Sequence, residues 1–122
     1  MSLGGLAEWL HTNGTGDAYQ ATLGFVGDIA TSTNGELSQY LAQEPRSTGD
    51  DRSDALLAAV AEYLAFEREI ATPRWCLQPE RFLTTAWFPV DLQSVRVRAL
   101  VSSPAAFWRR LIFIDRSDLV RV

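Results

Sequence analysis

The chain has 122 residues, enough for one domain with a single core, and its 47% hydrophobic and 21% charged residues exclude a chain that is disordered as a whole. The formal net charge of -4 argues against a general affinity for polyanions. No apolar run approaches the length of a membrane span, the first residues lack the pattern of a secretory signal, and the single Cys76 permits no internal disulfide, so we expect a cytoplasmic protein.

Charge is distributed unevenly along the chain. Residues 1–70 contain 11 acidic residues and 3 Arg, whereas residues 71–122 contain 4 acidic residues and 8 Arg. This asymmetry predicts that the two halves complement each other, either within one fold or across a homodimer.

The N-terminal part, residues 1–45, is predicted to be helical. Apolar residues recur at helical spacing from Leu3 to Leu10, and the Asn and Gly residues of 11–16 favour a turn after them. Residues 17–45 are typical of one or two further helices, with Asp17 as an N-cap. The stretch QEPRSTGDDRS, residues 43–53, is rich in Pro, Gly, Ser and Asp, which predicts a loop over 46–52.

Residues 53–70 give the strongest helix prediction in the sequence. Ala is plentiful there, and Asp50, Asp51 or Ser53 can cap the start. One apolar face is expected to form the centre of the core; it comprises Leu56, Leu57, Val60, Ala61 and Leu64.

Pro73, Pro79 and Pro89 divide the next stretch into short pieces. Asp91 is expected to cap a helix that ends near residue 101, although the alternation over 94–101 also fits a strand. Ser103 and Pro104 are expected to open a short helix through residue 110, followed by an extended segment. The predicted fold is therefore all-α: a single compact domain, 1–122, of five or six helices with a short extended segment near residue 112, the helical C-terminal part spanning 53–122.

The sequence offers little for catalysis or metal binding. His11 and Cys76 are its only imidazole and thiol groups, and they lie far apart in the chain. A lone histidine after a helix is more often a surface residue than a catalytic one, and Cys76 between Trp75 and Leu77 is typical of a buried small side chain. We therefore expect a protein that is not an enzyme, with no cofactor and no metal.

The C-terminal arginines permit two interpretations. Arg96, Arg98, Arg109, Arg110, Arg116 and Arg121 alternate with aromatic residues, a mixture that can contact phosphates and stack on bases. Alternatively, Arg109 and Arg110 lie in the last turn of a helix, where cations oppose the helix dipole. Trp108 is the first candidate for an exposed protein-binding residue, because Trp and Arg dominate binding hot spots.

Three segments together carry a resemblance: TGDDRSDALLAAVAEYLA, PRWCLQPERFLTTAWFP and VRALVSSPAAFWRRLIFIDRSDLVRV. Over residues 47–122 the chain resembles a group of small, largely uncharacterised actinobacterial proteins, some of them described as regulators or as antitoxin-like partners encoded beside a toxin such as a nucleotidyltransferase. Members of the group tend to have Arg and Gly where this chain has Trp108 and Leu111.

The resemblance implies a non-enzymatic protein–protein interaction or regulatory function, with a neighbouring gene product as partner. The residues expected to contact that partner are Trp108, Arg109, Arg110 and Arg98. The alternative function is a nucleic-acid-binding transcriptional regulator that uses the C-terminal arginines.

Overall fold

Helices make up the regular structure of the computed structural model, which describes residues 2–119. Their order is α1 (Leu3–Asn13), α2 (Ala18–Asp28), α3 (Asn34–Ala42), α4 (Asp51–Glu67), α5 (Gln93–Ser102) and α6 (Ala105–Trp108). Three short 3-10 helices accompany them: η1 (Arg74–Leu77), η2 (Pro79–Arg81) and η3 (Arg116–Leu119). The prediction of an all-α single domain is confirmed, and residues 2–119 contain no β-strand.

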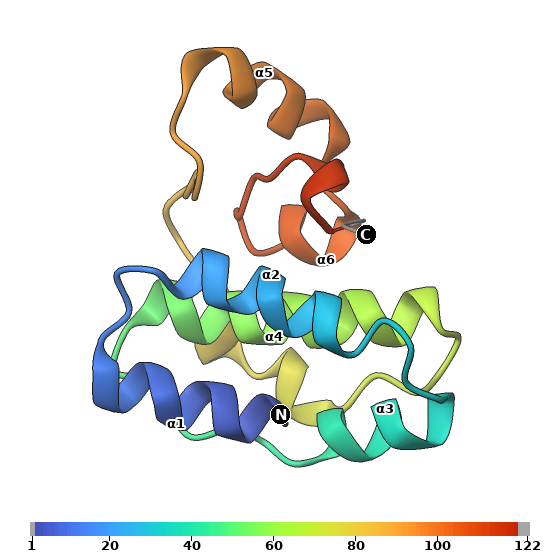
Figure 1. Ribbon diagram of the computed structural model, residues 1–122. Coiled ribbons are helices and arrows are strands. Elements are labelled where there is room, and N and C mark those ends of the chain that lie inside the picture. Colours follow the sequence, from blue (N-terminus) through green and yellow to red (C-terminus); the bar gives the residue numbers. More distant parts are fainter. Residues whose placement is uncertain (1, 120–122) are drawn as a thin grey trace.

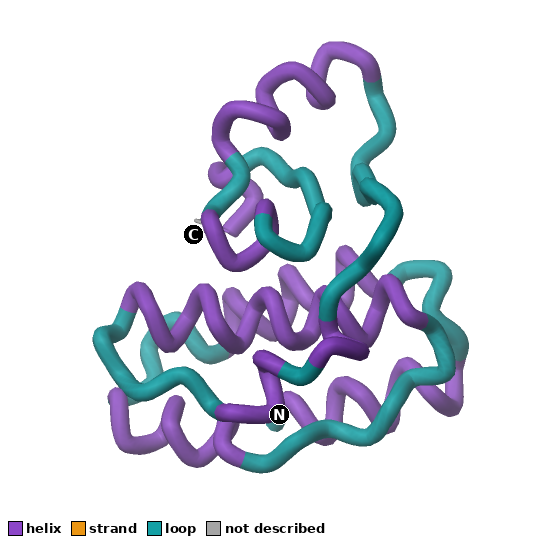
Figure 2. Tube along the Cα trace, turned by 180° about the vertical axis from the view of Figure 1, so that it is seen from behind, coloured by secondary structure: helices purple, strands orange, loops and turns teal. Residues whose placement is uncertain are grey.

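The elements form successive layers around α4 (Figure 1). Helices α1 and α3 make the outer layer on one side, α2 lies beside α4 in the middle, and the segment with α5 and α6 covers the other side. The same arrangement is seen from behind, where a long loop leads from the lower layers to α5 (Figure 2). α5 therefore lies at the opposite end of the molecule from α1.

Helix α4 is buried on all sides along its central part. Every residue from Ala55 to Ala61 is buried, because α2, α6 and the two short helices η1 and η2 pack on different sides of it. The sequence predicted one apolar face; the abundant alanines instead let neighbours approach from several directions. The start agrees with the prediction, since the Asp50 side chain accepts a hydrogen bond from the Ser53 backbone N–H at 2.9 Å.

The short extended segment near residue 112 is confirmed. Trp87 and Ile112 form an isolated parallel bridge, in which the Trp87 N–H donates to the Leu111 carbonyl and the Phe113 N–H donates to the Trp87 carbonyl. Further back in the chain, the indole N–H of Trp75 donates to the Leu41 carbonyl at 2.9 Å and ties η1 to the end of α3.

Two expected helix caps are wrong. Asp91 does not cap α5, whose N-cap is Leu92; its carboxylate instead pairs with Arg96 at 2.6 Å. Ser103 does not cap α6, because its hydroxyl donates to the carbonyls of Ala99 and Ile114 and accepts from the Ile114 N–H. A single serine thus joins the end of α5 to the extended segment.

Two helical segments end in a left-handed residue that is not glycine. After α4, Glu69 has φ 54°, with the Ile70 N–H bonded to the Ala65 carbonyl and the Glu69 N–H to the Phe66 carbonyl. After α6, Leu111 has φ 61°, with the Ile112 N–H bonded to the Phe107 carbonyl and the Leu111 N–H to the Trp108 carbonyl. Both are Schellman turns, in which glycine is the usual residue at this position.

Candidate functional site

Trp108 and Arg109 lie at the surface, at the end of α6. The side chain of Trp108 is 57% exposed. Arg109 donates to Glu62 Oε1 at 2.9 Å and lies over the Phe82 ring, while remaining half-exposed. An exposed indole beside a cation is the combination that most often anchors a protein partner.

Arg110 points the other way and is fully buried. Its guanidinium donates to the backbone carbonyls of Cys76, Ala106 and Arg81, and its Nη2 lies 3.2 Å from Glu62 Oε1. Burial lowers the pKa of Arg110 and the neighbouring Glu62 opposes this, so the group stays charged at neutral pH. Arg110 therefore fastens η1 and η2 to α6 and does not face a partner, unlike the role expected from the sequence.

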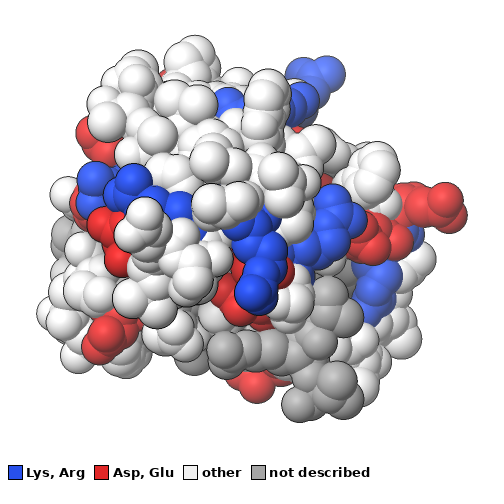
Figure 3. Space-filling view, turned by 90° about the horizontal axis from the view of Figure 1, so that it is seen from above, with Lys and Arg blue, Asp and Glu red and all other residues white. Residues whose placement is uncertain are grey.

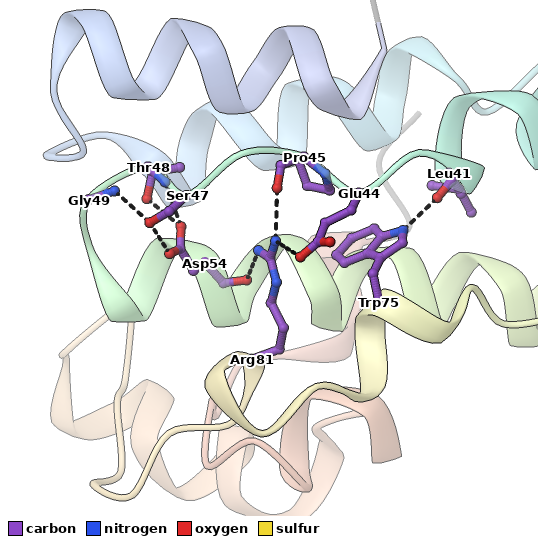
Figure 4. Close-up of polar contacts among 9 residues, drawn as sticks. All are labelled: Leu41, Glu44, Pro45, Ser47, Thr48, Gly49, Asp54, Trp75 and Arg81. Carbon is purple, nitrogen blue, oxygen red and sulfur yellow. Dashed lines mark hydrogen bonds and ion pairs between the residues drawn. The ribbon is translucent and has the colours of Figure 1, made fainter.

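Arg81 is a second buried arginine whose guanidinium joins distant segments through their backbone carbonyls; we call Arg110 and Arg81 the two guanidinium clamps. Arg81 donates to the carbonyls of Asp54 and Pro45, lies 3.6 Å from the Glu44 carboxylate, and covers the ring of Trp75 (Figure 4). The Asp54 carboxylate meanwhile accepts from Thr48 and Ser47, whose loop leads into α4. These contacts hold the 44–50 loop, α4 and η2 together.

Arg98 lies on α5 and is exposed. It pairs with Asp115 at 3.4 Å, which links α5 to the segment before η3. The pKa of Asp115 is lowered, chiefly by the Ser117 backbone N–H and hydroxyl, with Arg98 adding to the effect. Seen from the side of α5, the surface consists of broad uncharged areas crossed by arginines that lie beside acidic groups (Figure 3).

Helix α5 presents apolar side chains to solvent. Ala99 is its one buried residue within the described part of the chain, whereas Val97, Leu100 and Val101 are 68%, 51% and 82% exposed. A helix this apolar on its outer side is unusual on the surface of an isolated domain.

A groove of about 480 Å³ runs between α4 and α6, close to the end of α5. This volume lies within the range of ligand sites, roughly 300–1,000 Å³. Its apolar lining includes Phe66, which is 78% exposed, and Leu77, which is 52% exposed. Pro104 and Ala105 form part of the α6 side. The groove therefore has the form of a site for apolar side chains.

Charges of opposite sign border the groove. Tyr63 lines it between Glu67 of α4 and Arg116 of η3, and its edge packs on Phe107. The pKa of Tyr63 is raised by burial and by Glu67, and Arg116 opposes the rise. Within residues 2–119, neither Glu67 nor Arg116 forms an ion pair, and the Arg116 guanidinium donates to the Ser102 carbonyl.

The groups considered for catalysis lie apart from this groove. Cys76 is fully buried, and burial raises the pKa of its thiol to about 12. His11 is exposed on α1 with Nε2 3.3 Å from Arg46. Among residues 2–119 no cluster of three or more His, Cys, Asp or Glu side chains could hold a metal ion. The described helices include none that is long and apolar enough to cross a membrane.

Compared with known proteins, the chain matches no family model, no curated protein and no solved structure. The site is therefore assessed on its own geometry. Of the residues expected at a partner surface, Trp108, Arg109 and Arg98 are exposed and Arg110 is buried. Arg121 of the wider arginine set lies outside the described residues.

Sequence reasoning missed the groove and the two clamps. A signal existed for Arg110, because it shares a helical face with Ala106 and Phe107, four and three residues before it, and both are buried. No local signal marks Arg81, whose acceptors belong to residues 27 and 36 positions away in the chain.

Proposed function

We propose that the protein is a non-enzymatic interaction protein, the antitoxin-like or regulatory partner of a neighbouring gene product. The contact surface is centred on Trp108, with Arg109 and Arg98 as charged neighbours. The observation that carries the proposal is the indole of Trp108, which is 57% exposed at the end of a helix whose other face is fully buried.

The rigid local structure around Trp108 supports a role in binding. Phe107 before it is fully buried, Arg110 after it holds three backbone carbonyls, and a Schellman turn follows. A side chain held on a rigid helix loses little conformational freedom when a partner covers it. An exposed tryptophan in such a place gives a partner large apolar area at a small entropic cost.

The pairing of the arginines favours a protein partner over nucleic acid. Arg96, Arg98 and Arg109 each pair with a carboxylate, and Arg110 is buried. A cation that already pairs with a carboxylate of its own chain contributes less to phosphate binding and counterion release. The chain as a whole is also acidic, with a formal net charge of -4.

Co-expression tests the proposal. The protein is produced with the tagged product of its neighbouring gene, and the pair is separated by size-exclusion chromatography. We expect a stable complex, and Trp108→Ala should weaken it by at least about 30-fold, as for a hot-spot residue. Trp9→Ala is the matched control, because Trp9 is 47% exposed on α1, far from α6 (Figure 1).

Two results would contradict the proposal. One is separate elution of the two proteins at all concentrations. The other is equal weakening by Trp108→Ala and Trp9→Ala, which would show that neither indole marks the contact. Thermal unfolding of both variants establishes that each retains the fold.

A further inference from the structure

The groove between α4 and α6 has an apolar lining that includes aromatic rings. Tyr63 and Phe66 of α4 lie on one side and Leu77 of η1 also lines the groove, with Phe66 and Leu77 largely open to solvent. Its volume of about 480 Å³ lies toward the smaller end of the roughly 300–1,000 Å³ that small-molecule sites occupy. An aromatic body that displaces water from these side chains gains apolar contact and ring packing.

Two of the charged groups that line the groove already satisfy each other. Glu62 Oε1 accepts a hydrogen bond from Arg109 at 2.9 Å and lies 3.2 Å from the buried Arg110. The Glu62 side chain is only 14% exposed, so its carboxylate is committed to the fold. The other two charged groups of the lining, Glu67 and Arg116, are the ones that a ligand can pair with.

Glu67 and Arg116 provide one acidic and one basic group beside Tyr63. Both are exposed, and neither forms an ion pair within residues 2–119. Arg116 uses Nε for the Ser102 carbonyl at 3.4 Å, and its two Nη groups make no hydrogen bond in the described chain. Burial raises the pKa of Tyr63, Glu67 raises it further and Arg116 lowers it, so both charges lie near this one side chain.

We propose that the groove binds a free amino acid with an aromatic side chain. The ring lies against Phe66 and Leu77, the ammonium group donates to the Glu67 carboxylate, and the ligand carboxylate accepts from Arg116. A molecule with a single charge meets one group of opposite sign and one of like sign, whereas a zwitterion pairs with both. The site does not depend on the proposed function, because Trp108 does not line the groove.

A titration with L-phenylalanine, followed by two-dimensional amide NMR, measures both the affinity and the place of binding. We expect a dissociation constant of about 1 mM or lower, as for a compact ligand of this size. The shift changes should centre on the residues around Phe66, Leu77 and Ala105, which line the groove. The absence of saturable changes, or changes centred elsewhere, would overturn the proposal.

Three relatives of L-phenylalanine test whether both charges are recognised. Phenethylamine lacks the carboxylate and hydrocinnamate lacks the amine. N-acetyl-L-phenylalaninamide has neither charge and has the form of a residue within a peptide. Each should bind at least about fivefold more weakly than L-phenylalanine, because charge-assisted hydrogen bonds are lost. If any of the three binds as tightly, the proposal is refuted; with the amide, that result would assign the groove to a peptide chain.

Two variants with matched controls test the residues. Glu67→Gln and Arg116→Gln should each weaken L-phenylalanine binding at least about fivefold. Glu69→Gln and Arg74→Gln should leave the affinity unchanged, because both residues are exposed and neither lines the groove. Glu67→Gln should also reduce the preference for L-phenylalanine over hydrocinnamate, a change that a loss of folded protein does not produce.

The outcome for this site is separate from the outcome for the protein partner. Equal weakening by Glu67→Gln and Glu69→Gln, or by Arg116→Gln and Arg74→Gln, would contradict the proposed amino-acid site. Failure of L-phenylalanine to bind, while the neighbouring gene product still forms a complex, would refute the amino-acid site and leave the proposed function standing.

Discussion

Glu69, directly after α4, has φ 54°, a conformation that glycine adopts freely and other residues do not. We predict that Glu69→Gly stabilises the protein. The side chain of Glu69 is exposed, and within residues 2–119 no hydrogen bond or ion pair involves that side chain, so its removal breaks no described contact.

The size of the gain follows from three contributions. A left-handed conformation at a residue with a Cβ costs roughly 1–2 kcal/mol, which glycine avoids. Glycine gives up roughly 0.5–1 kcal/mol through its larger freedom in the unfolded chain. Removal of a negative charge near the negative end of the α4 dipole returns about 0.3 kcal/mol at an exposed site. The free energy of unfolding should rise by about 1 kcal/mol, and Tm by about 4 °C.

Chemical and thermal unfolding of three proteins tests this reasoning. Glu69→Ala removes the same carboxylate and keeps the strained backbone, so it should gain only the small dipole contribution. Glu67→Gly places a glycine inside the last turn of α4, where it should lower the free energy of unfolding by about 1 kcal/mol. If Glu69→Gly is no more stable than Glu69→Ala, the left-handed backbone does not cause the effect and the reasoning is refuted.

The remaining predictions concern buried and titrating groups. Arg110→Met should lower the free energy of unfolding by about 3–5 kcal/mol in urea titrations, because three buried carbonyls lose their donor and Glu62 keeps only Arg109 as its ion-pair partner. The half-exposed Arg109→Met should lower the free energy of unfolding by less than about 1 kcal/mol. Similar effects of the two would contradict the burial of Arg110. Cys76, with a thiol pKa of about 12, should resist iodoacetamide at neutral pH and react at once in denaturant; rapid reaction in the native protein would be inconsistent with this. The pKa of Asp115 is lowered, so its contribution to the free energy of unfolding is present above the ordinary value of 3.8 and is lost as pH falls through the lowered pKa. Asp115→Asn should therefore make the free energy of unfolding fall less steeply with decreasing pH in the acid range. An unchanged acid dependence would argue against this contribution.

The features that sequence reasoning recovered are local ones. The helix that became α4 was predicted from its alanines, its apolar spacing and the cap at Asp50, all of which act within one or two turns. The extended segment near Ile112 was predicted from a short apolar run after a proline-started helix. Both depend on neighbours in the chain, so the pattern of residues contains the needed information.

The features that it missed depend on contacts between distant segments. The groove exists because α6 lies across α4, about forty residues away, and no single stretch of sequence records that distance. Arg109 and Arg110 are adjacent and identical in type, yet one is half-exposed and the other fully buried. Their roles differ because consecutive residues of a helix point in directions about 100° apart, and only the packed neighbours decide which direction is inward.

The two buried guanidinium clamps make the order of synthesis matter for this chain. Arg110 holds the carbonyl of Cys76, 34 residues earlier, and Arg81 holds the carbonyl of Pro45, 36 residues earlier. A growing chain that has passed residue 80 but not residue 110 has its long central helix complete, while the carbonyls beside Cys76 still face water. The packing of η1 and η2 on α6 therefore depends on a residue that is synthesised 34 positions after Cys76.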